Sequence, residues 1–135
     1  IMGLSYYHWW HERNLSELQN DLNALANTFN KDILIAETAY PFTLGWNDNT
    51  NNIYGTGYPL LPGYTATPEG QQKFLTDLRT VIYNIPNKHG LGFCYWAPDW
   101  TAFRGSAAIN GSPWENLALF DFTGKALPGL SAFAQ

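Results

Sequence analysis

The sequence "DILIAETAYPFT", residues 32 to 43, places one carboxylate, Glu37, directly after a run of apolar residues. The run from Ile33 to Ala36 has no polar face, which is typical of a strand covered on both sides, as in a parallel sheet packed by helices. A carboxylate at the end of such a strand can act as a nucleophile or as a general acid or base. It can equally enter solvent or pair with a cation of a loop, and the residue types alone leave both interpretations open.

Two aromatic side chains hold equivalent positions after other predicted strands. One strand is predicted in "IMGLSYYHWW" up to about Tyr7, and another in "GLGFCYW" up to Trp96. A carboxylate between a phenol and an indole is typical of a sugar site, because Tyr can hydrogen-bond the acid and Trp offers a flat apolar face to a pyranose ring. Large aromatic residues at strand ends also occur as core or rim packing. Strict alternation predicts three sets of residues that each share a face: Ile33, Ile35 and Glu37; Gly92, Cys94 and Trp96; and Gly3, Ser5 and Tyr7.

Helices predicted between the strands would hold these residues in place. Asn14 can cap a first helix, with Glu17 in the capping-box position and apolar residues at helical spacing after it. Thr67 and Pro68 are typical of the start of a second helix. A loop rich in Pro, Gly, Asn and Tyr, from residue 41 to about 66, separates the Glu37 strand from this second helix.

The predicted elements alternate regularly between strand and helix, without hairpin turns, which predicts a parallel sheet. The closing elements are "SPWE", residues 112 to 115, which matches a capping box, and a short helix in "FTGKALPGLSAFA". A complete (β/α)8 barrel needs about 250 residues. We therefore expect the 135 residues to form about three β/α units at the C-terminal end of such a TIM barrel. A free-standing doubly wound domain is the competing architecture, although no glycine-rich phosphate loop follows any strand.

The composition argues against several kinds of partner. The formal net charge is -4, and only seven Lys and Arg are scattered along the chain, so neither nucleic acid nor an anionic membrane is expected to bind. No segment approaches the roughly 20 apolar residues of a membrane span. The single cysteine, Cys94, excludes an internal disulfide and a multi-cysteine zinc site. Aromatic residues make up 16% of the chain, more than a core of this size needs, so some are expected to face a ligand.

Five segments that together span essentially the whole chain carry a resemblance to a known family. They are "IMGLSYYHWWH", "ILIAETAYPFT", "TPEGQQKFLTDL", "GFCYWAPDW" and "WENLALFDFTGKALP", of which ETAYP is the most specific. The sequence resembles the arabinogalactan endo-β-1,4-galactanases, glycoside hydrolase family 53. The resemblance implies that residues 1–135 are the C-terminal part of the catalytic domain, with barrel strands six to eight. It also implies endo-acting, retaining hydrolysis of β-1,4-galactosidic bonds in galactan or arabinogalactan, and hence a secreted or otherwise extracytoplasmic protein.

The resemblance assigns roles to individual residues. Glu37 matches the family's nucleophile at the end of the seventh strand, Tyr7 or its neighbour Tyr6 matches the sixth-strand aromatic, and Trp96 matches the eighth-strand Trp beneath the sugar. A retaining mechanism needs a second carboxyl about 5 to 5.5 Å away; the resemblance places it in an Asn-Glu pair on the fourth strand, which this sequence lacks. We therefore expect the chain alone to be inactive and the remainder of the barrel to be required. Asp99 is expected at the rim of the substrate site.

The loop that follows ETAYP holds the remaining candidates. Trp46 is expected to flank the substrate cleft. Some bacterial relatives bind calcium in this loop, but here Asp48 is the only acid and Asn49 one of several amides, so calcium is a weak candidate and an Asn-rich turn is the simpler interpretation. No cofactor is expected. His8 and His11 lack carboxylate or Cys partners nearby and are interpreted as loop or rim residues, not metal ligands.

Two other functions stay open. Another β-glycanase of the same clan, such as a mannanase or a xylanase, is an alternative because Tyr, Glu and Trp on successive strands are shared more widely than ETAYP. A non-catalytic carbohydrate-binding fragment is the other, since exposed aromatic residues alone bind sugars. As a bare fragment, the chain would carry open strand edges, which favour aggregation unless another segment covers them.

Overall fold

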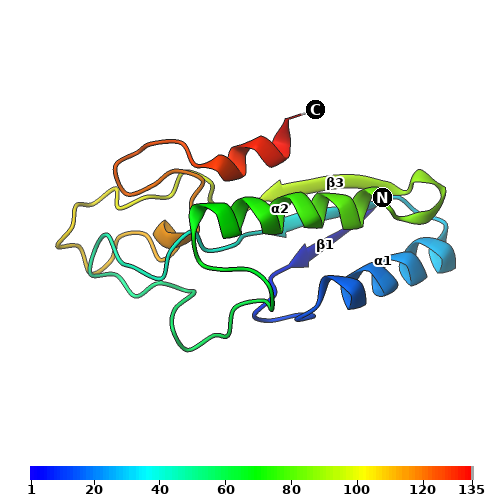
Figure 1. The fold of residues 1–135 in the computed structure, drawn as a ribbon, viewed down its shortest axis with the longest axis horizontal. Coiled ribbons are helices and arrows are strands. Elements are labelled where there is room, and N and C mark those ends of the chain that lie inside the picture. Colours follow the sequence, from blue (N-terminus) through cyan, green and yellow to red (C-terminus); the bar gives the residue numbers. More distant parts are fainter. Residues whose placement is uncertain (135) are drawn as a thin grey trace.

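The computed structural model describes residues 1–134 and contains one parallel sheet with two α-helices (Figure 1). The strands β1 (Met2–Tyr6), β2 (Ile33–Thr38) and β3 (Gly90–Tyr95) are hydrogen-bonded in the order β1-β2-β3, and the helices are α1 (Leu15–Phe29) and α2 (Pro68–Tyr83). Short 3-10 helices follow at η1 (Pro86–Lys88), η2 (Glu115–Leu117) and η3 (Pro128–Phe133). The predicted alternation and the parallel sheet are confirmed. Within residues 1–134, no helix has the length and apolar character needed to cross a membrane.

Both helices begin at the predicted caps. The side chain of Asn14 accepts a 2.8 Å hydrogen bond from the Ser16 backbone N–H, and that of Thr67 accepts a 3.0 Å bond from the Gly70 N–H. Each cap satisfies a backbone donor that lacks a partner within its helix. Helix α1 ends where Asn30 adopts the left-handed conformation, with φ 49°.

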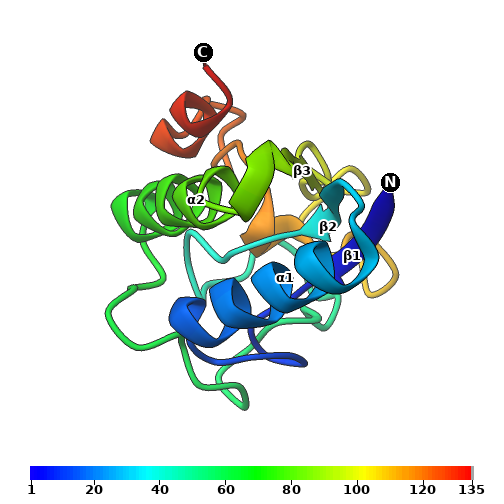
Figure 2. The ribbon, with the colours of Figure 1, turned by 90° about the vertical axis from the view of Figure 1, so that its right-hand side faces the viewer.

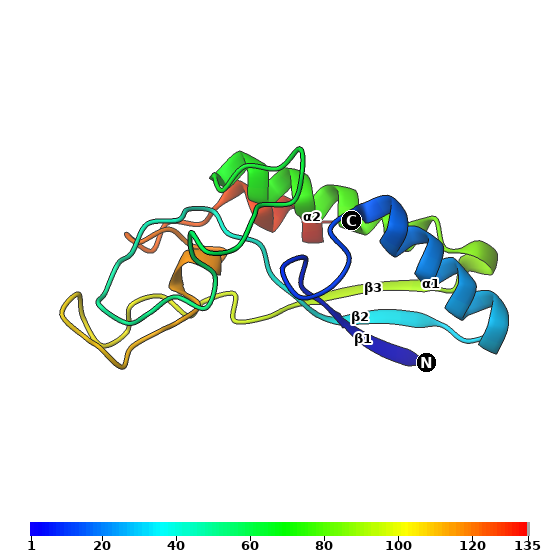
Figure 3. The same ribbon diagram turned by 90° about the horizontal axis from the view of Figure 1, so that it is seen from below.

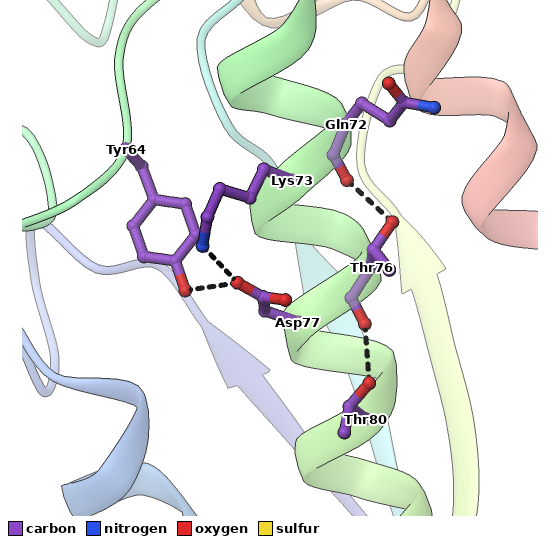
Figure 4. Close-up of polar contacts among 6 residues, drawn as sticks. All are labelled: Tyr64, Gln72, Lys73, Thr76, Asp77 and Thr80. Carbon is purple, nitrogen blue, oxygen red and sulfur yellow. Dashed lines mark hydrogen bonds and ion pairs between the residues drawn. The ribbon is translucent and has the colours of Figure 1, made fainter.

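Polar contacts on the outer side of α2 tie the preceding loop to the helix (Figure 4). Lys73 and Asp77, one helical turn apart, form a 2.6 Å ion pair, and the Tyr64 hydroxyl donates a 2.8 Å bond to the same carboxylate. The Lys73 ammonium also lies 4.2 Å from the centre of the Tyr64 ring. The hydroxyls of Thr76 and Thr80 donate to backbone carbonyls one turn earlier, which leaves this face polar.

The helices cover one face of the sheet, and the opposite face carries no helix of the described chain (Figures 2 and 3). The core lies between sheet and helices, where Ile33 and Ile35 of β2 are fully buried. The buried helical residues that pack against them include Leu18, Leu22, Ala26, Phe74, Leu75, Leu78 and Ile82. In a complete barrel the uncovered face is the interior, so its exposure here is what a part of a barrel should show.

An irregularity in β2 changes the face on which Glu37 lies. Leu4 of β1 pairs with Ile35, but the next residue, Ser5, pairs with Glu37, so Ala36 is an additional residue of β2. Because paired residues share a face and Ser5 is exposed, Glu37 lies on the open face, away from the buried Ile35. The prediction that Ile33, Ile35 and Glu37 share one face is therefore wrong, and the bulge is the reason.

The two long connections after β2 and β3 lie together beyond the carboxyl ends of the strands (Figure 1). Backbone hydrogen bonds join them, including Asn49 N–H to Ala108 C=O at 2.8 Å and Ile53 N–H to Pro113 C=O at 2.8 Å. The capping box predicted at residues 112 to 115 does not start an α-helix. A single 3-10 turn, η2, follows, and Glu115 is buried within it.

Candidate active site

The carboxylate of Glu37 and the hydroxyl of Tyr7 meet where β2 and β1 end. The Tyr7 hydroxyl donates a 3.1 Å hydrogen bond to Oε2 of Glu37. Burial and, after it, the hydrogen bond to Glu37 raise the pKa of Tyr7 above its ordinary value. Tyr7 therefore keeps its proton at neutral pH, and its hydroxyl can hold and orient the Glu37 carboxyl group.

A track of aromatic rings leads away from this pair. The ring of Tyr7 lies 5.8 Å from that of Trp114, Trp114 lies 6.1 Å from Trp96, and Trp96 lies 6.3 Å from Trp100. The Trp10 ring, half exposed, lies 5.3 Å from Tyr7 on another side. The sequence does not point to Trp114, because "SPWE" is typical of a helix start. Its aromatic type beside a proline is the available signal.

Trp96 is held at the end of β3 by the continuing ladder of the sheet. Its N–H donates a 2.8 Å bond to the carbonyl of Thr38, the residue next to Glu37. Its side chain is 38% exposed, so a flat indole face remains available at the same end of the sheet as Glu37. The structure thus brings Tyr7, Glu37 and Trp96 to the same end of the sheet, as the strand ends predict.

Behind these residues, the side chains of Tyr95 and Gln71 form hydrogen bonds that join the segments on which the site residues lie. The Tyr95 hydroxyl accepts a 3.0 Å bond from the Tyr40 N–H and donates to the Leu117 carbonyl at 2.7 Å. The Gln71 side-chain amide of α2 donates to the carbonyls of Tyr40, at 2.9 Å, and Ala118, at 3.0 Å. Neither residue is evident from the sequence, since a Gln in an amphipathic helix and a Tyr in a strand carry no local signal of these partners.

Tyr6 and His8 lie elsewhere than expected. The Tyr6 ring is buried on the helix side of the sheet against Phe74, and its hydroxyl donates a 2.9 Å bond to the Glu12 carbonyl, so of the two tyrosines only Tyr7 reaches Glu37. His8 lies in the turn after β1, as expected of a loop residue, but it is not at a rim: it is 1% exposed, with its ring 4.8 Å from that of Tyr40. Burial, aided by the positive charge of Arg13, lowers the pKa of His8 to about 4, so its ring is neutral. His11 is exposed, and its Nδ1 accepts a 3.0 Å bond from the Tyr7 N–H.

Trp46 and Asp99 are both exposed in the loops at this end of the sheet. The Asp99 carboxylate forms no hydrogen bond with another residue of the described chain, although its backbone carbonyl accepts one from the Thr101 N–H at 2.9 Å. Asp99 lines a hollow together with Trp100 and Phe103. Trp46 precedes Asn47, whose N–H is bound to a buried carboxylate. Neither side chain contacts Glu37 through a hydrogen bond, so both lie at the periphery of the candidate site.

The calcium candidate Asp48 is used by the protein itself. Its carboxylate accepts bonds from the N–H groups of Thr50, at 2.6 Å, and Ser112, at 3.4 Å. Oε1 of the buried Glu115 accepts from the N–H groups of Asn47, at 2.6 Å, and Asp48, at 3.2 Å. Asn49 is exposed. Among residues 1–134, no group of three or more His, Cys, Asp or Glu side chains is placed to hold a metal ion.

Comparisons with known proteins point in the same direction as the geometry. The family model described as "Glycosyl hydrolase family 53" matches residues 1–133. An "Arabinogalactan endo-beta-1,4-galactanase" of Cellvibrio japonicus is 39% identical over 98% of this chain and 35% of its own length. An "Uncharacterized protein in bgaB 5'region" of Niallia circulans is 42% identical over 98% of the chain and 36% of its own length.

A solved structure agrees with these sequence relatives. The "Ignisphaera aggregans GH53 catalytic domain" superposes with a TM-score of 0.87 at 38% identity, over 98% of this chain and 37% of that one. The chain thus spans just over a third of the length of the proteins it matches. The match covers nearly the whole chain, and the parallel sheet with one covered face fits a segment of their barrel. The chain belongs to glycosyl hydrolase family 53, and its fold is the corresponding part of a (β/α)8 barrel.

Proposed function

We propose that this chain is the nucleophile-bearing part of an endo-acting β-1,4-galactanase that cleaves galactan or arabinogalactan. The observation that carries the proposal is the hydrogen bond of 3.1 Å between Tyr7 and Glu37 at the open, carboxyl end of the sheet, beside the exposed Trp96. The name of the Cellvibrio japonicus relative supplies the substrate. A polysaccharide substrate also favours a secreted or otherwise extracytoplasmic location.

The proposed reaction is a double displacement that retains configuration. The Glu37 carboxylate attacks the anomeric carbon, the bond from that carbon to the leaving oxygen breaks, and a second carboxylic acid gives its proton to that oxygen. The same second group then takes a proton from water, which attacks the anomeric carbon and releases Glu37 as a carboxylate. Tyr7 donates its hydrogen bond to Glu37 in the resting state and fixes the direction of the carboxylate. Trp96 offers an apolar face to the sugar ring.

The second acid must come from outside residues 1–135, which is why we propose that the chain is inactive alone. Both edge strands are open: β1 and β3 each pair on one side only. A hollow of about 300 Å³ beside β3 is lined by both polar and apolar residues, among them Arg79, Leu91 and Phe93, and Leu91 is 51% exposed. Such edges need further strands to pair with, and the remaining barrel units would supply both the strands and the acid.

The test joins residues 1–135 to the preceding part of the Cellvibrio japonicus galactanase to give a complete barrel, called the chimeric barrel below. We expect the chimeric barrel to release oligosaccharides from galactan faster than from mannan or xylan, and the chain alone to release none. A 2-deoxy-2-fluoro galactobioside with an activated leaving group should leave a sugar covalently attached to the peptide that contains Glu37. Faster cleavage of mannan or xylan would instead support the alternative glycanases.

The matched control separates catalysis from binding. Glu37→Gln keeps the shape of the side chain and removes its charge, so cleavage and covalent labelling should both disappear while galactan binding stays. If the Glu37→Gln barrel cleaved galactan at the unaltered rate, the assignment of Glu37 as nucleophile would be wrong. If the unaltered barrel bound galactan but never cleaved it, a carbohydrate-binding role would be the better conclusion.

A further inference from the structure

Tyr7, whose hydroxyl is bound to Glu37, lies just beyond the end of the sheet. Strand β1 ends at Tyr6, and the last pair of the β1–β2 ladder joins Tyr6 to Thr38. Tyr7 is 3% exposed, so its backbone N–H and carbonyl need partners within the protein. The side chain that orients the candidate nucleophile therefore belongs to a residue that the ladder does not reach, and another segment must fix it.

His11 binds both backbone groups of Tyr7. Its ring Nδ1 accepts a 3.0 Å hydrogen bond from the Tyr7 N–H, and its own N–H donates a 2.9 Å bond to the Tyr7 carbonyl. The Trp10 N–H donates a second 2.9 Å bond to the same carbonyl. The turn from residue 7 to residue 11 is thus closed by three hydrogen bonds, and His11 makes two of them.

The bond at Nδ1 also defines the form of the His11 ring. A backbone N–H can only donate, so Nδ1 must carry no proton, and the ring proton of the neutral imidazole lies on Nε2. His11 is exposed, so water can accept a hydrogen bond from this Nε2–H. The ring lies 6.4 Å from that of Tyr6 at an angle of 30°, and this stacking supports the orientation in which Nδ1 faces Tyr7.

The aromatic rings around Tyr7 do not replace this support. The rings of Trp9, Trp10 and Trp114 lie 5.0, 5.3 and 5.8 Å from its own. Aromatic pairs tolerate a range of offsets and tilts, whereas a hydrogen bond weakens steeply as its angle departs from linearity. The Tyr7 hydroxyl is at the far end of its side chain, so a small rotation of the backbone moves it by a larger distance relative to Glu37.

From these contacts we infer that His11 is a positioning residue of the active site, which sets the direction of the Glu37 carboxylate through Tyr7. In this role it need not touch the sugar, and it acts through an Nδ1 that carries no proton. A misdirected nucleophile still allows the substrate to bind but attacks more slowly, because attack needs the reacting atoms aligned. The inference rests on the proposed function, since it takes Glu37 as the nucleophile.

Three substitutions of His11 in the chimeric barrel test this role. His11→Leu removes the acceptor and keeps a side chain of moderate size, so kcat/KM on galactan should fall roughly tenfold. His11→Asn places an oxygen close to the position of Nδ1 and should restore most of the rate. His11→Gln carries the same amide one carbon farther out and should stay slow. Arg13→Leu is the matched control, because Arg13 is exposed in the same connection between β1 and α1, and its rate should be unaltered.

A binding measurement separates positioning from contact with the sugar. In the barrel that carries Glu37→Gln, titration calorimetry with galactohexaose should give the same Kd with and without His11→Leu. A Kd that weakens as much as kcat/KM falls overturns the inference, since His11 would then bind the substrate. An unaltered rate in His11→Leu also overturns it, as does a slow His11→Asn barrel whose unfolding temperature equals that of the unaltered barrel.

Crystal structures of the barrel keep this inference separable from the proposed function. The Tyr7 hydroxyl should lie within hydrogen-bond distance of Glu37 in the unaltered and His11→Asn barrels, and should be displaced in His11→Leu, whether or not the barrel cleaves galactan. In mildly alkaline buffer, nitrogen-15 NMR of histidine-labelled barrel should show the His11 proton on Nε2. A proton on Nδ1, or an undisplaced Tyr7 in His11→Leu, overturns the inference and leaves Glu37 as the proposed nucleophile.

Discussion

The Tyr95 hydroxyl lies 3.3 Å from Nε2 of Gln71, and both side chains point at the carbonyl of Tyr40, three residues after Glu37. One of them comes from the last residue of β3, directly before Trp96, and the other from the first turn of α2. The pair therefore connects the strand end of Glu37, the strand end of Trp96 and the helix that packs behind them. We therefore expect this contact, together with the bond from the Trp96 N–H to the Thr38 carbonyl, to fix the position of the Glu37 strand end relative to the Trp96 strand end.

Tyr95→Phe should destabilise the protein and misplace the site. The change removes one oxygen and leaves the Tyr40 N–H and the Leu117 carbonyl short of a buried partner. We expect the free energy of unfolding of the chimeric barrel to fall by about 2 kcal/mol and kcat/KM on galactan to fall with it. Urea denaturation and initial rates measure the two effects. Tyr83→Phe is the control, because Tyr83 is 83% exposed, and equal effects of the two changes would contradict the role of Tyr95.

Tyr7→Phe should reduce activity with little loss of fold. It removes the hydrogen bond to Glu37 and leaves the ring in contact with Trp9 and Trp114. A hydrogen bond to a charged group contributes about 1.5 to 3 kcal/mol, so kcat/KM on galactan should fall roughly tenfold or more. Steady-state kinetics of the chimeric barrel give the answer, with the unfolding temperature as a check on the fold. Unaltered kinetics would show that Tyr7 does not position Glu37.

Glu115 should stabilise the contact between the loops that follow β2 and β3, because its carboxylate in one loop accepts hydrogen bonds from the backbone of the other. In Glu115→Ala the N–H groups of Asn47 and Asp48 lose their acceptor, which should lower the free energy of unfolding by about 3 kcal/mol. Glu115→Gln keeps an oxygen for both donors and should cost much less. Urea denaturation of the two variants at pH 7 distinguishes them.

The carboxyl group of Glu115 should also make the stability of the protein depend on pH. Burial raises the pKa of Glu115 above its ordinary value of 4.5, against the opposing effect of the two backbone hydrogen bonds. The unfolded state therefore loses this proton first, so the ionised Glu115 reduces stability as the pH rises above about 4.5. Glu115→Gln has no carboxyl group to ionise, so it avoids this loss of stability. The free energy of unfolding of the Glu115→Gln variant, relative to that of the unaltered protein, should therefore increase from pH 4 to pH 7. A constant difference over this range would contradict the raised pKa.

Local patterns in the sequence predicted the elements and the ends of the strands. The caps at Asn14 and Thr67 act through bonds to residues two or three positions away, so their signal is contained in a short window. Parallel alternation then places all strand ends at one edge, which brought Tyr7, Glu37 and Trp96 together in the prediction. The helix caps can thus be predicted from residues close together in the sequence, and the common position of the strand ends from the rule that parallel strands end at the same edge of a sheet.

What the sequence could not predict depends on partners far along the chain. The bulge at Ala36 follows from pairing with β1, more than thirty positions earlier, and it reverses the face of Glu37. Glu115 resembles a capping residue in its local pattern, yet it binds an N–H 68 positions away. Gln71 lies 47 positions from the Ala118 carbonyl that it satisfies. Such contacts are set by tertiary packing, which overrides the local signal of a capping box or an amphipathic helix.

His8 should make stability fall as the solution becomes acidic. Burial lowers the pKa of His8 to about 4 from an ordinary value of 6.5, so between these pH values the unfolded chain takes up a proton that the folded one does not. Stability is therefore complete above pH 6.5 and decreases towards pH 4, by up to about 3 kcal/mol from this group. His8→Phe keeps a ring among the neighbouring aromatic side chains and cannot be protonated, so urea midpoints of the chimeric barrel with this change should vary less between pH 7 and pH 4.5. Nδ1 of His8 has no partner among residues 1–134, and Nε2 lies 3.4 Å from the Tyr54 hydroxyl, so the substitution removes this one long hydrogen bond. Parallel curves for the two proteins over that range would show that His8 is protonated as easily in the folded chain as in the unfolded one.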